Sequence, residues 1–482
     1  MNARTLLPTR RAWKLSAALL ASLLIALPAT AQVRLSSPAL ARDSEALFLN
    51  PANLLLDDFR SPFELSIGQF RASGGGDLIQ LHHYNNAFSQ GASLSTAETN
   101  ALLEDWFGPL SKGRMRHAVM DVRMVPVALT MRGYKWGAGL GVRVRSFSQF
   151  GLSRGLFQLL LQGTNQNADL PLDFSMRSMT LAEASLGLSY LIPKKKIAIG
   201  VAPKMVFGLH YAEATLDSEL SLRPNSITHR FGYTVRTAGR LNYAITENVD
   251  ASSYGLWQDV LEPDYADPNT LIAGTGFGFD MGYTQEIRKH LIVSASLTDV
   301  GYVRWSESAE SLQPADSVFQ FSGLDIDLNR LDDEFDGDMG AYIEDLMSTL
   351  YEDSYEETIH TAGAFRTALP TAFHTGATLY MARGRWLVNG GASVGLSRVA
   401  GNLGRKPSMY MSTEWRFGKG RVIPVRLGTQ FGGSGAAIFG FETGMKTPVY
   451  GFNIGVAVTP KSDLIGNGSR FALYLSMLNL RI

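Results

Sequence analysis

Leu271–Trp305, with the sequence LIAGTGFGFDMGYTQEIRKHLIVSASLTDVGYVRW, carries the clearest periodic pattern in the chain. Every second residue from Thr275 to Tyr283 is threonine, methionine or aromatic, and the residues between them are glycines and Asp280. After a polar turn at Arg288–His290 the alternation resumes, with aliphatic residues on one face and serine or threonine on the other. Because successive side chains of a strand point to opposite faces, this pattern predicts a β-hairpin.

The distribution of residues between the two faces indicates the kind of sheet. One face is large and apolar, while the other is small or weakly polar and carries few of the long charged groups of a soluble surface. A transmembrane β-barrel has this arrangement, because its outer face contacts lipid and its inner face contacts a polar lumen. A glycine-rich strand pair in a soluble sandwich is the alternative interpretation.

A second alternating stretch, Trp136–Arg145, indicates which face of the strand points into the lumen. Its apolar residues alternate with glycines and with Arg143 and Arg145. An arginine facing hydrocarbon would cost roughly 2–4 kcal/mol at the membrane midplane. We therefore expect both arginines to face the lumen and the apolar residues to face lipid.

Composition limits the classes of protein that remain. The chain has 482 residues, 48 glycines, no cysteine and a formal net charge of zero. This length suits one large barrel or two to three soluble domains. The balanced charge argues against a nucleic-acid partner, which would require a basic excess. Without cysteine there is no disulfide framework and no thiolate metal site.

The N-terminus predicts export. Basic residues precede the apolar run Leu15–Leu27, and Ala29–Ala31 offers small residues at cleavage positions. This is the pattern of a cleaved signal peptide over residues 1–31. A membrane-anchoring helix is the alternative, but it needs about 20 apolar residues. No later run of about 18 apolar residues follows. An exported, alternating chain predicts the outer membrane of a Gram-negative bacterium.

Residues 32–60 are not strand-like and predict a compact N-terminal segment. A short amphipathic stretch ends at Asn50, Pro51, Ala52 and Asn53. Proline disfavours a continuing helix and biases the residue before it toward extended geometry. One interpretation is a segment that plugs or lines the barrel, with these four residues as gating candidates. The other is a periplasmic tail.

Residues 61–482 supply the strands of the predicted barrel. Six tight turns join six hairpins, and one strand before the first and one after the last bring the number to about fourteen. Very short connections lie near residues 132, 193, 288, 383, 420 and 448. The count leaves His229–Ala244 out of the barrel and keeps both termini on the tight-turn side, as bacterial barrels require. Pro126 indicates a bulge or bend.

The predicted fold class is therefore all-β, a transmembrane antiparallel β-barrel of about fourteen strands with an N-terminal lumen segment and helical loop insertions. Helical patches are expected near Leu102–Phe107 and within residues 150–178. Aromatic residues near the tight turns predict a girdle at the membrane interface. They are Tyr134, Trp136, Tyr283, Tyr380, Trp386, Trp415, Phe417 and Tyr450.

A long acidic loop insert is expected at residues 306–370. Between Asp325 and Glu357 there are 13 aspartates or glutamates and one arginine. Asp332–Asp338 partly imitates a calcium loop, but Ile343 stands where the bidentate glutamate belongs. A solvated acidic loop is the alternative that we favour. Apolar residues within residues 342–355 keep helical spacing and predict an amphipathic helix.

No catalytic constellation is present, so we expect that the chain is not an enzyme and has no cofactor or metal. Neither a P-loop nor an HExxH motif occurs. His82 and His83 are adjacent, but no second pair has helical ligand spacing. The lumen candidates either set polarity for a permeant or form a structural network of paired charges. They are Arg143, Arg145, Asp280, Glu414 and Arg416.

Three motifs carry a resemblance. Asp43–Leu54 (DSEALFLNPANL), Gly276–Trp305 and Ala368–Tyr380 (ALPTAFHTGATLY) resemble segments of FadL-like outer-membrane proteins, the long-chain fatty-acid transporters and their relatives in type IX secretion. The resemblance implies a fourteen-stranded barrel with an N-terminal segment in its lumen. The chain departs from the family at Arg34–Ala41, where a glycine-rich run is usual, and at Ile482, where an aromatic residue is common.

We expect transport or binding of small hydrophobic molecules across the outer membrane. The alternative is a scaffold barrel that docks other cell-envelope or secretion proteins through residues 306–370. The expected partners are outer-membrane lipid, a hydrophobic small-molecule ligand and such an envelope protein, with no nucleic acid. A barrel hydrolase is disfavoured because no triad is present.

Overall fold

A computed structural model describes residues 39–56, 61–78, 95–108, 115–163, 167–223, 226–239, 271–314, 318–321, 358–399, 407–432, 435–459 and 470–481. Three predictions lie outside the described residues: the signal peptide over residues 1–31, the histidines at 82 and 83, and the calcium-like and helical stretches within residues 325–357. Among the described helices, none is long and apolar enough to cross a bilayer.

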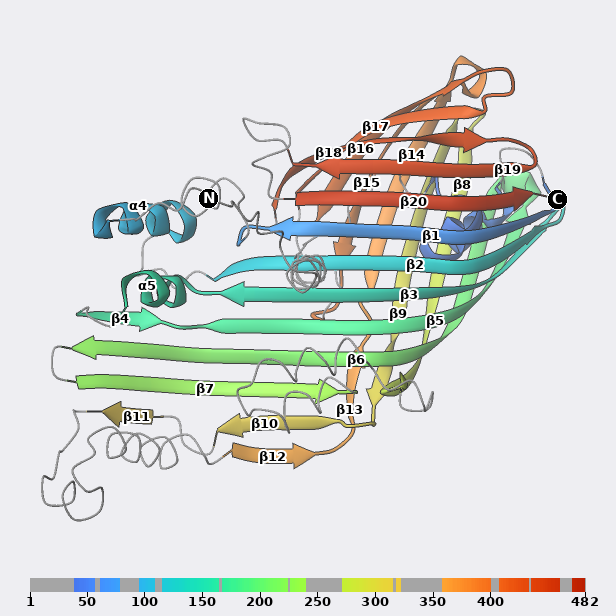
Figure 1. The fold of residues 1–482 in the computed structure, drawn as a ribbon. Helices are drawn as coiled ribbons and strands as arrows, with labels where there is room; N and C mark the ends of the chain where they lie inside the picture. Colours follow the sequence, from blue (N-terminus) through green and yellow to red (C-terminus); the bar gives the residue numbers. More distant parts are fainter. Residues whose placement is uncertain are drawn as a thin grey trace, which may run out of the picture.

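Fourteen antiparallel strands form one closed barrel (Figure 1). In order around the barrel they are β1 (Phe63–Gly76), β2 (Arg116–Arg132), β3 (Trp136–Leu152), β5 (Phe174–Ile192), β6 (Ile197–Arg223), β8 (Gly274–Arg288), β9 (Leu291–Trp305), β14 (Ala372–Met381), β15 (Trp386–Gly395), β16 (Ser408–Phe417), β17 (Ile423–Gly432), β18 (Gly435–Lys446), β19 (Tyr450–Val458) and β20 (Arg470–Arg481). The last strand pairs with the first, with Arg481 opposite Glu64. The predicted fold class is confirmed, and the soluble sandwich is excluded.

All six predicted tight turns join neighbouring barrel strands. They connect β2 to β3, β5 to β6, β8 to β9, β14 to β15, β16 to β17 and β18 to β19. The pairing of Glu64 with Arg481 also places the start of β1 and the end of β20 at the tight-turn end. Tight turns and barrel termini therefore share one rim, as Figure 1 shows for the C-terminus.

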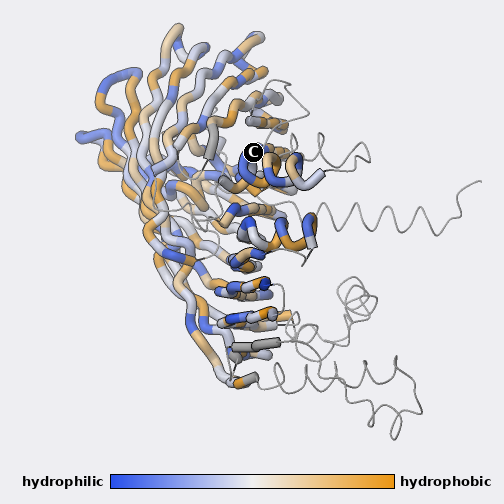
Figure 2. Tube along the Cα trace, turned by 90° about the vertical axis from the view of Figure 1, so that its left-hand side faces the viewer, coloured by the Kyte–Doolittle hydropathy of each residue, from blue (hydrophilic) through white to orange (hydrophobic). Residues whose placement is uncertain are grey.

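The predicted orientation of the side chains is confirmed along the hairpin β8–β9. Phe277 is 53% exposed on the outer face, whereas Asp280 on the opposite face is fully buried. Arg143 and Arg145 are buried on the lumen side of β3. Figure 2 shows the resulting alternation of polar and apolar residues along the strands. The outer surface is thus the apolar surface that a bilayer requires.

Most of the predicted aromatic girdle lies on the outer face near the tight turns. Tyr134 and Trp136 are exposed there, and Trp386 stacks on Trp415 with ring centroids 6.3 Å apart. Tyr380 is an exception and corrects the prediction. Its hydroxyl accepts a hydrogen bond of 2.8 Å from Arg42, so its ring belongs to the lumen rather than to the girdle.

Beyond the barrel the sheet continues on one side. The outer half of β6 pairs with β7 (Ser226–Ala238) and with β4 (Ala168–Pro171). Strand β7 in turn pairs with β10 (Glu310–Pro314) and β11 (Val318–Phe321). Closer to the tight turns, residues Ile197–Gly208 of β6 pair with β8 instead of β7. The segment that begins at His229 is therefore outside the fourteen-stranded ring, as the strand count required.

Two helices lie at the end of the barrel opposite the tight turns (Figure 1). Helix α4 (Thr96–Phe107) begins with a capping box in which Ser95 and Glu98 satisfy each other's backbone N–H groups. Helix α5 (Arg154–Gln162) packs against it through Phe157, whose ring centroid lies 5.0 Å from that of Trp106. The predicted helical insertions are confirmed in type and approximate position.

Residues 306–370 are not a single loop, which corrects the prediction for their described part. Strand β12 (Thr358–Ala362) pairs with β10, and β13 (Phe365–Ala368) pairs with β9 in the barrel wall. Short strands arise here because the insert runs alongside the unpaired edges of β7 and β9, whose backbone groups need partners.

Candidate functional site

An N-terminal segment fills part of the barrel interior. Residues 39–56, here called the lumen segment, comprise helix α2 (Asp43–Leu49) and the 3₁₀ helix η1 (Pro51–Leu55). Nearly all of its residues are buried. The proline stands at the first helical position, where its missing N–H and fixed φ are favourable. An amphipathic sequence thus forms helices that bury their apolar side inside the barrel.

Two asparagines attach the segment to the wall. Asn50 donates to Thr284 Oγ1 at 3.0 Å, and its Oδ1 accepts from the N–H of Ala52 at 3.3 Å. Asn53 accepts from the Thr284 hydroxyl at 2.6 Å and donates to the carbonyl of Ala41 at 3.0 Å. These buried amides are therefore satisfied by specific partners, which fixes the segment's position.

The glycines of the inner face make room for the lumen segment. A Cβ at Gly282 would lie 2.1 Å from Asn50 Oδ1, and one at Gly200 would lie 2.4 Å from the backbone nitrogen of Ala52. A Cβ at Gly187 would similarly meet the side chain of Leu47 at 2.6 Å. The glycine face of the strands is hence the surface against which the segment packs.

The start of the segment is bound where the first strand of the barrel, β1, pairs with the last, β20. Asp43 accepts from Arg132 at 2.5 Å on β2 and from Arg481 at 3.4 Å on β20. Arg481 also donates to Glu64 on β1 at 2.8 Å. One ionic group therefore joins the first two strands, the last strand and the lumen segment.

Further along the lumen wall, three cations face three carboxylates. Arg143 donates to Glu183 at 2.6 Å, and Arg145 donates to Asp299 at 2.7 Å. Lys204 lies 2.8 Å from Asp280 and 2.5 Å from Asp299. The members of this wall cluster are Arg143, Arg145, Glu183, Lys204, Asp280 and Asp299. The formal charges cancel, as buried ions require.

A second inner group lies across the barrel. Glu414 accepts from Arg416 at 2.6 Å and from Arg426 at 2.5 Å. Arg426 also pairs with Glu442 at 2.7 Å. The sequence predicted the inward position of Glu414 and Arg416. It did not predict that Glu414 also pairs with Arg426 on β17, or that Arg426 pairs with Glu442 on β18.

The structure brings Arg143, Arg145 and Asp280 together and places Glu414 and Arg416 in a separate group. Sequence reasoning missed Glu183, Lys204 and Asp299. Glu183 and Lys204 lie at inward positions of predicted strands, whereas a bulge turns Asp299 inward against the alternation. The missing information was the strand register, because it decides which inward charges meet. Each of the five predicted lumen residues has an opposite charge within ion-pair distance.

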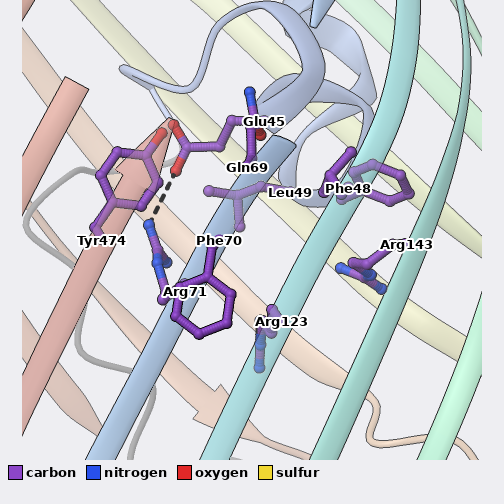
Figure 3. A pocket seen from close by; sticks show the side chains of 10 residues that line it. Glu45, Phe48, Leu49, Gln69, Phe70, Arg71, Arg123, Arg143 and Tyr474 are labelled. Carbon is purple, nitrogen blue, oxygen red and sulfur yellow. Dashed lines mark ion pairs between the residues drawn. The ribbon is translucent and has the colours of Figure 1, made fainter. Parts of the chain in front are cut away.

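A small pocket lies between helix α2 and the barrel wall (Figure 3). It has a volume of about 80 Å³. Apolar and aromatic side chains meet arginines here, with Arg71 over the ring of Tyr474 at 5.1 Å and Arg143 over the ring of Phe48 at 4.8 Å. Arg71 is also 3.8 Å from Glu45. The lining is Glu45, Phe48, Leu49, Gln69, Phe70, Arg71, Arg123, Val125, Arg143 and Tyr474.

An apolar cluster stands on the lumen side beyond the wall cluster. Trp305 is fully buried, with its ring centroid 5.2 Å from that of Tyr211, and its indole N–H donates to Thr367 at 2.8 Å. Leu369, between β13 and β14, is buried in the same cluster. This cluster and the lumen segment both lie inside the barrel.

The described residues include no group of three histidines, aspartates or glutamates placed to hold a metal ion. The interior instead holds paired cations and carboxylates beside aromatic and aliphatic side chains.

The closed ring of strands, the apolar exterior and the segment inside the lumen define a transmembrane β-barrel of fourteen strands with an N-terminal segment in its interior. The chain belongs to the family described as "Family of unknown function (DUF5723)", whose profile matches residues 56–447. No curated protein matches the chain.

Several solved structures are similar to it in fold. One is the Pseudomonas putida toluene transporter TodX, with 10% identity, coverage of 91% of this chain and 94% of that chain, and a TM-score of 0.43. The Ralstonia pickettii toluene transporter TbuX matches with 9% identity, 91% and 94% coverage and a TM-score of 0.45. A Pseudomonas aeruginosa FadL homologue matches with 9% identity, 92% and 95% coverage and a TM-score of 0.45.

Proposed function

We propose that this barrel lies in the outer membrane and passes small hydrophobic or amphipathic molecules through its lumen. Short turns face the periplasm in bacterial barrels, and long connections face the outside. The extension of β6 and β7 would then stand on the cell surface. The single observation that carries the proposal is the pocket at helix α2, where aromatic and aliphatic side chains converge with arginines inside a membrane barrel.

The chemistry of this pocket defines the class of permeant. Phe48, Leu49 and Val125 offer apolar surface, and Arg71 and Arg123 offer hydrogen-bond donors. Apolar walls with few convergent polar groups are typical of small-molecule sites. An aromatic hydrocarbon or an alkyl carboxylate would match this lining.

The size of the pocket implies that the lumen segment gates passage. Its volume of about 80 Å³ is below the roughly 150 Å³ of a cavity that admits benzene. A permeant therefore needs helix α2 to shift away from the wall. The residues that hold the segment in place, Asn50, Pro51, Ala52 and Asn53, would control that shift through their contacts with β6 and β8.

A disulfide lock tests the gating. The chain has no cysteine, so Asn53→Cys with Thr284→Cys introduces one pair, at side chains that lie 2.6 Å apart. The purified barrel is reconstituted into liposomes, and uptake of labelled toluene and labelled octanoate is measured with the pair oxidised and reduced. We expect the oxidised pair to abolish protein-dependent uptake and reduction to restore it.

The two single-cysteine variants are the matched controls, since they carry the same substitutions without a cross-link. Equal uptake by oxidised and reduced protein would contradict gating by the lumen segment. Uptake equal to that of empty liposomes in every state would contradict transport itself.

We also propose a second function, in which residues 306–370 dock a cell-envelope protein. The supporting observation is the sheet extension, because β10 and β12 hold both ends of the acidic stretch at the side of β7. Pull-down from membranes with the full chain and with residues 320–358 deleted discriminates the two. An acidic contact predicts loss of the partner on deletion, and an unchanged set of partners would contradict docking.

A further inference from the structure

A basic cavity lies at the tight-turn rim, apart from the pocket at helix α2. Its volume is about 640 Å³. The turn between β14 and β15, the turn between β16 and β17, and the end of β18 form its walls. The lining is Tyr380, Ala382, Arg383, Gly384, Arg385, Arg416, Gly420, Arg421, Pro424 and Lys446. Five of these ten side chains are cationic, and no carboxylate is among them.

Most of these cations lack a partner within the part of the chain that the structure describes. Arg416 pairs with Glu414, which is shared with Arg426. No ion pair with a described carboxylate is found for Arg383, Arg385, Arg421 or Lys446. The wall cluster differs from the rim cavity in this respect, because its three cations face three carboxylates. Among the described residues, the rim cavity therefore has an excess of positive charge, which a mobile anion would neutralise.

The backbone of the turns supports a role for these side chains. Arg383 and Arg421 have φ values of 57° and 63°. Glycine or asparagine adopts this left-handed region at lower cost. The chain nevertheless places an arginine at each of these positions, and both line the cavity. Non-glycine residues in such conformations concentrate at functional sites.

The cavity belongs to the lumen mouth rather than to the lipid surface. Tyr380 contacts Arg42 of the lumen segment, and Arg416 contacts the inward carboxylate of Glu414. Apart from Tyr380, Ala382 and Pro424, the lining consists of cationic side chains and glycines. Guanidinium groups bind phosphate and carboxylate through paired hydrogen bonds. The volume is within the range of small-molecule sites.

We propose that this rim cavity is a binding site for a compact multivalent anion that carries phosphate or carboxylate groups. The inference does not depend on hydrophobic transport, because the cavity differs from the pocket at helix α2 in its lining and its position. The four lining cations without an ion pair to a described carboxylate would bind such an anion through charge-assisted hydrogen bonds. They would also attract it from the aqueous phase.

Calorimetric titration of the detergent-solubilised full chain tests the proposal, with pyrophosphate as the phosphate probe and citrate as the carboxylate probe. The variant is Arg383→Gln with Arg421→Gln. The control is Arg288→Gln with Lys289→Gln, which removes the same charge at the β8–β9 turn, outside the cavity lining. We expect saturable binding that weakens more than about tenfold in the first variant and stays unchanged in the control.

Absence of saturable binding, or equal weakening in both variants, would overturn the proposal. Preference for pyrophosphate or for citrate identifies the anion group, and either result supports the site. Hexaglutamate is titrated as a third probe. If it alone binds, the cavity recognises an acidic protein segment, and the small-anion proposal is wrong.

Discussion

Asp299 faces Asp280 across a β-bulge, and the backbone N–H of Asp299 donates to Oδ1 of Asp280 at 2.6 Å. The register shifts between Phe279 and Met281, so Thr298 and Asp299 are both buried on the lumen side. Asp299 has a φ of 60°, a left-handed conformation that is uncommon outside glycine and asparagine. The bulge thus brings a second carboxylate to the cations of the wall cluster.

The wall cluster should depend on its charge balance. Lys204→Met removes the cation that lies between Asp280 and Asp299. An uncompensated buried charge costs about 3–5 kcal/mol. We expect the free energy of unfolding, measured by urea titration in detergent, to fall by that amount.

An exposed pair provides the comparison for Lys204. Lys196 is 2.9 Å from Glu286, and both side chains are substantially exposed. Lys196→Met should change the same free energy by less than about 1 kcal/mol. Equal losses in the two variants would contradict the role assigned to the wall cluster.

A methyl group at Gly282 should displace the lumen segment. The added Cβ would lie 2.1 Å from Asn50 Oδ1, so Gly282→Ala leaves no room for the present contact. We expect faster amide hydrogen exchange at Ala46–Leu49 while the barrel stays folded. Gly363→Ala is the control, because no atom lies within 4 Å of its added Cβ. Unchanged exchange in Gly282→Ala would show that the glycine face does not seat the segment.

A charged residue on the outer face should lower the stability of the barrel by an amount that depends on its depth in the bilayer. Leu140 is 58% exposed on the outer face of β3, at the next outward position after the girdle residue Trp136 and its neighbour Ala138, and Tyr134 is 84% exposed at a tight turn. Leu140→Arg should lower the free energy of folding into bilayers by roughly 2–4 kcal/mol, whereas an interfacial arginine such as Tyr134→Arg should cost about 0–1 kcal/mol. The measurement is reversible folding into lipid vesicles. A smaller loss at Leu140 than at Tyr134 would contradict the membrane placement.

Much of the barrel could be predicted from the sequence, because alternation and short turns are local properties. The hairpin at Leu271–Trp305 and the bulge at Pro126 are examples, since β2 and β3 shift register between Met124 and Val127. The outward or inward position of a side chain follows from its parity within a strand. This parity was enough to place Arg143 on the lumen side.

The pairing of charges could not be predicted in the same way. Lys204 meets Asp299 only because β6, β8 and β9 take one register and because the bulge turns Asp299 inward. Tyr380 was assigned to the girdle from its distance to a turn, although its strand parity and its contact with Arg42 place it in the lumen. The charge pairing depends on contacts between residues far apart in the chain, which periodicity does not report, whereas strand parity alone would have placed Tyr380 inward.

The orientation of the strands is the central claim, and oxygen accessibility of single spin labels in bilayers tests it most directly. The absence of native cysteine allows Phe277→Cys, Met281→Cys and Ala295→Cys for the outer face, and Ser294→Cys and Ser296→Cys for the inner face. We predict high oxygen accessibility at the three outer positions and low accessibility at the two inner ones. Equal accessibility on both faces, or a preference of the outer positions for a water-soluble relaxation agent, would contradict a membrane-spanning barrel.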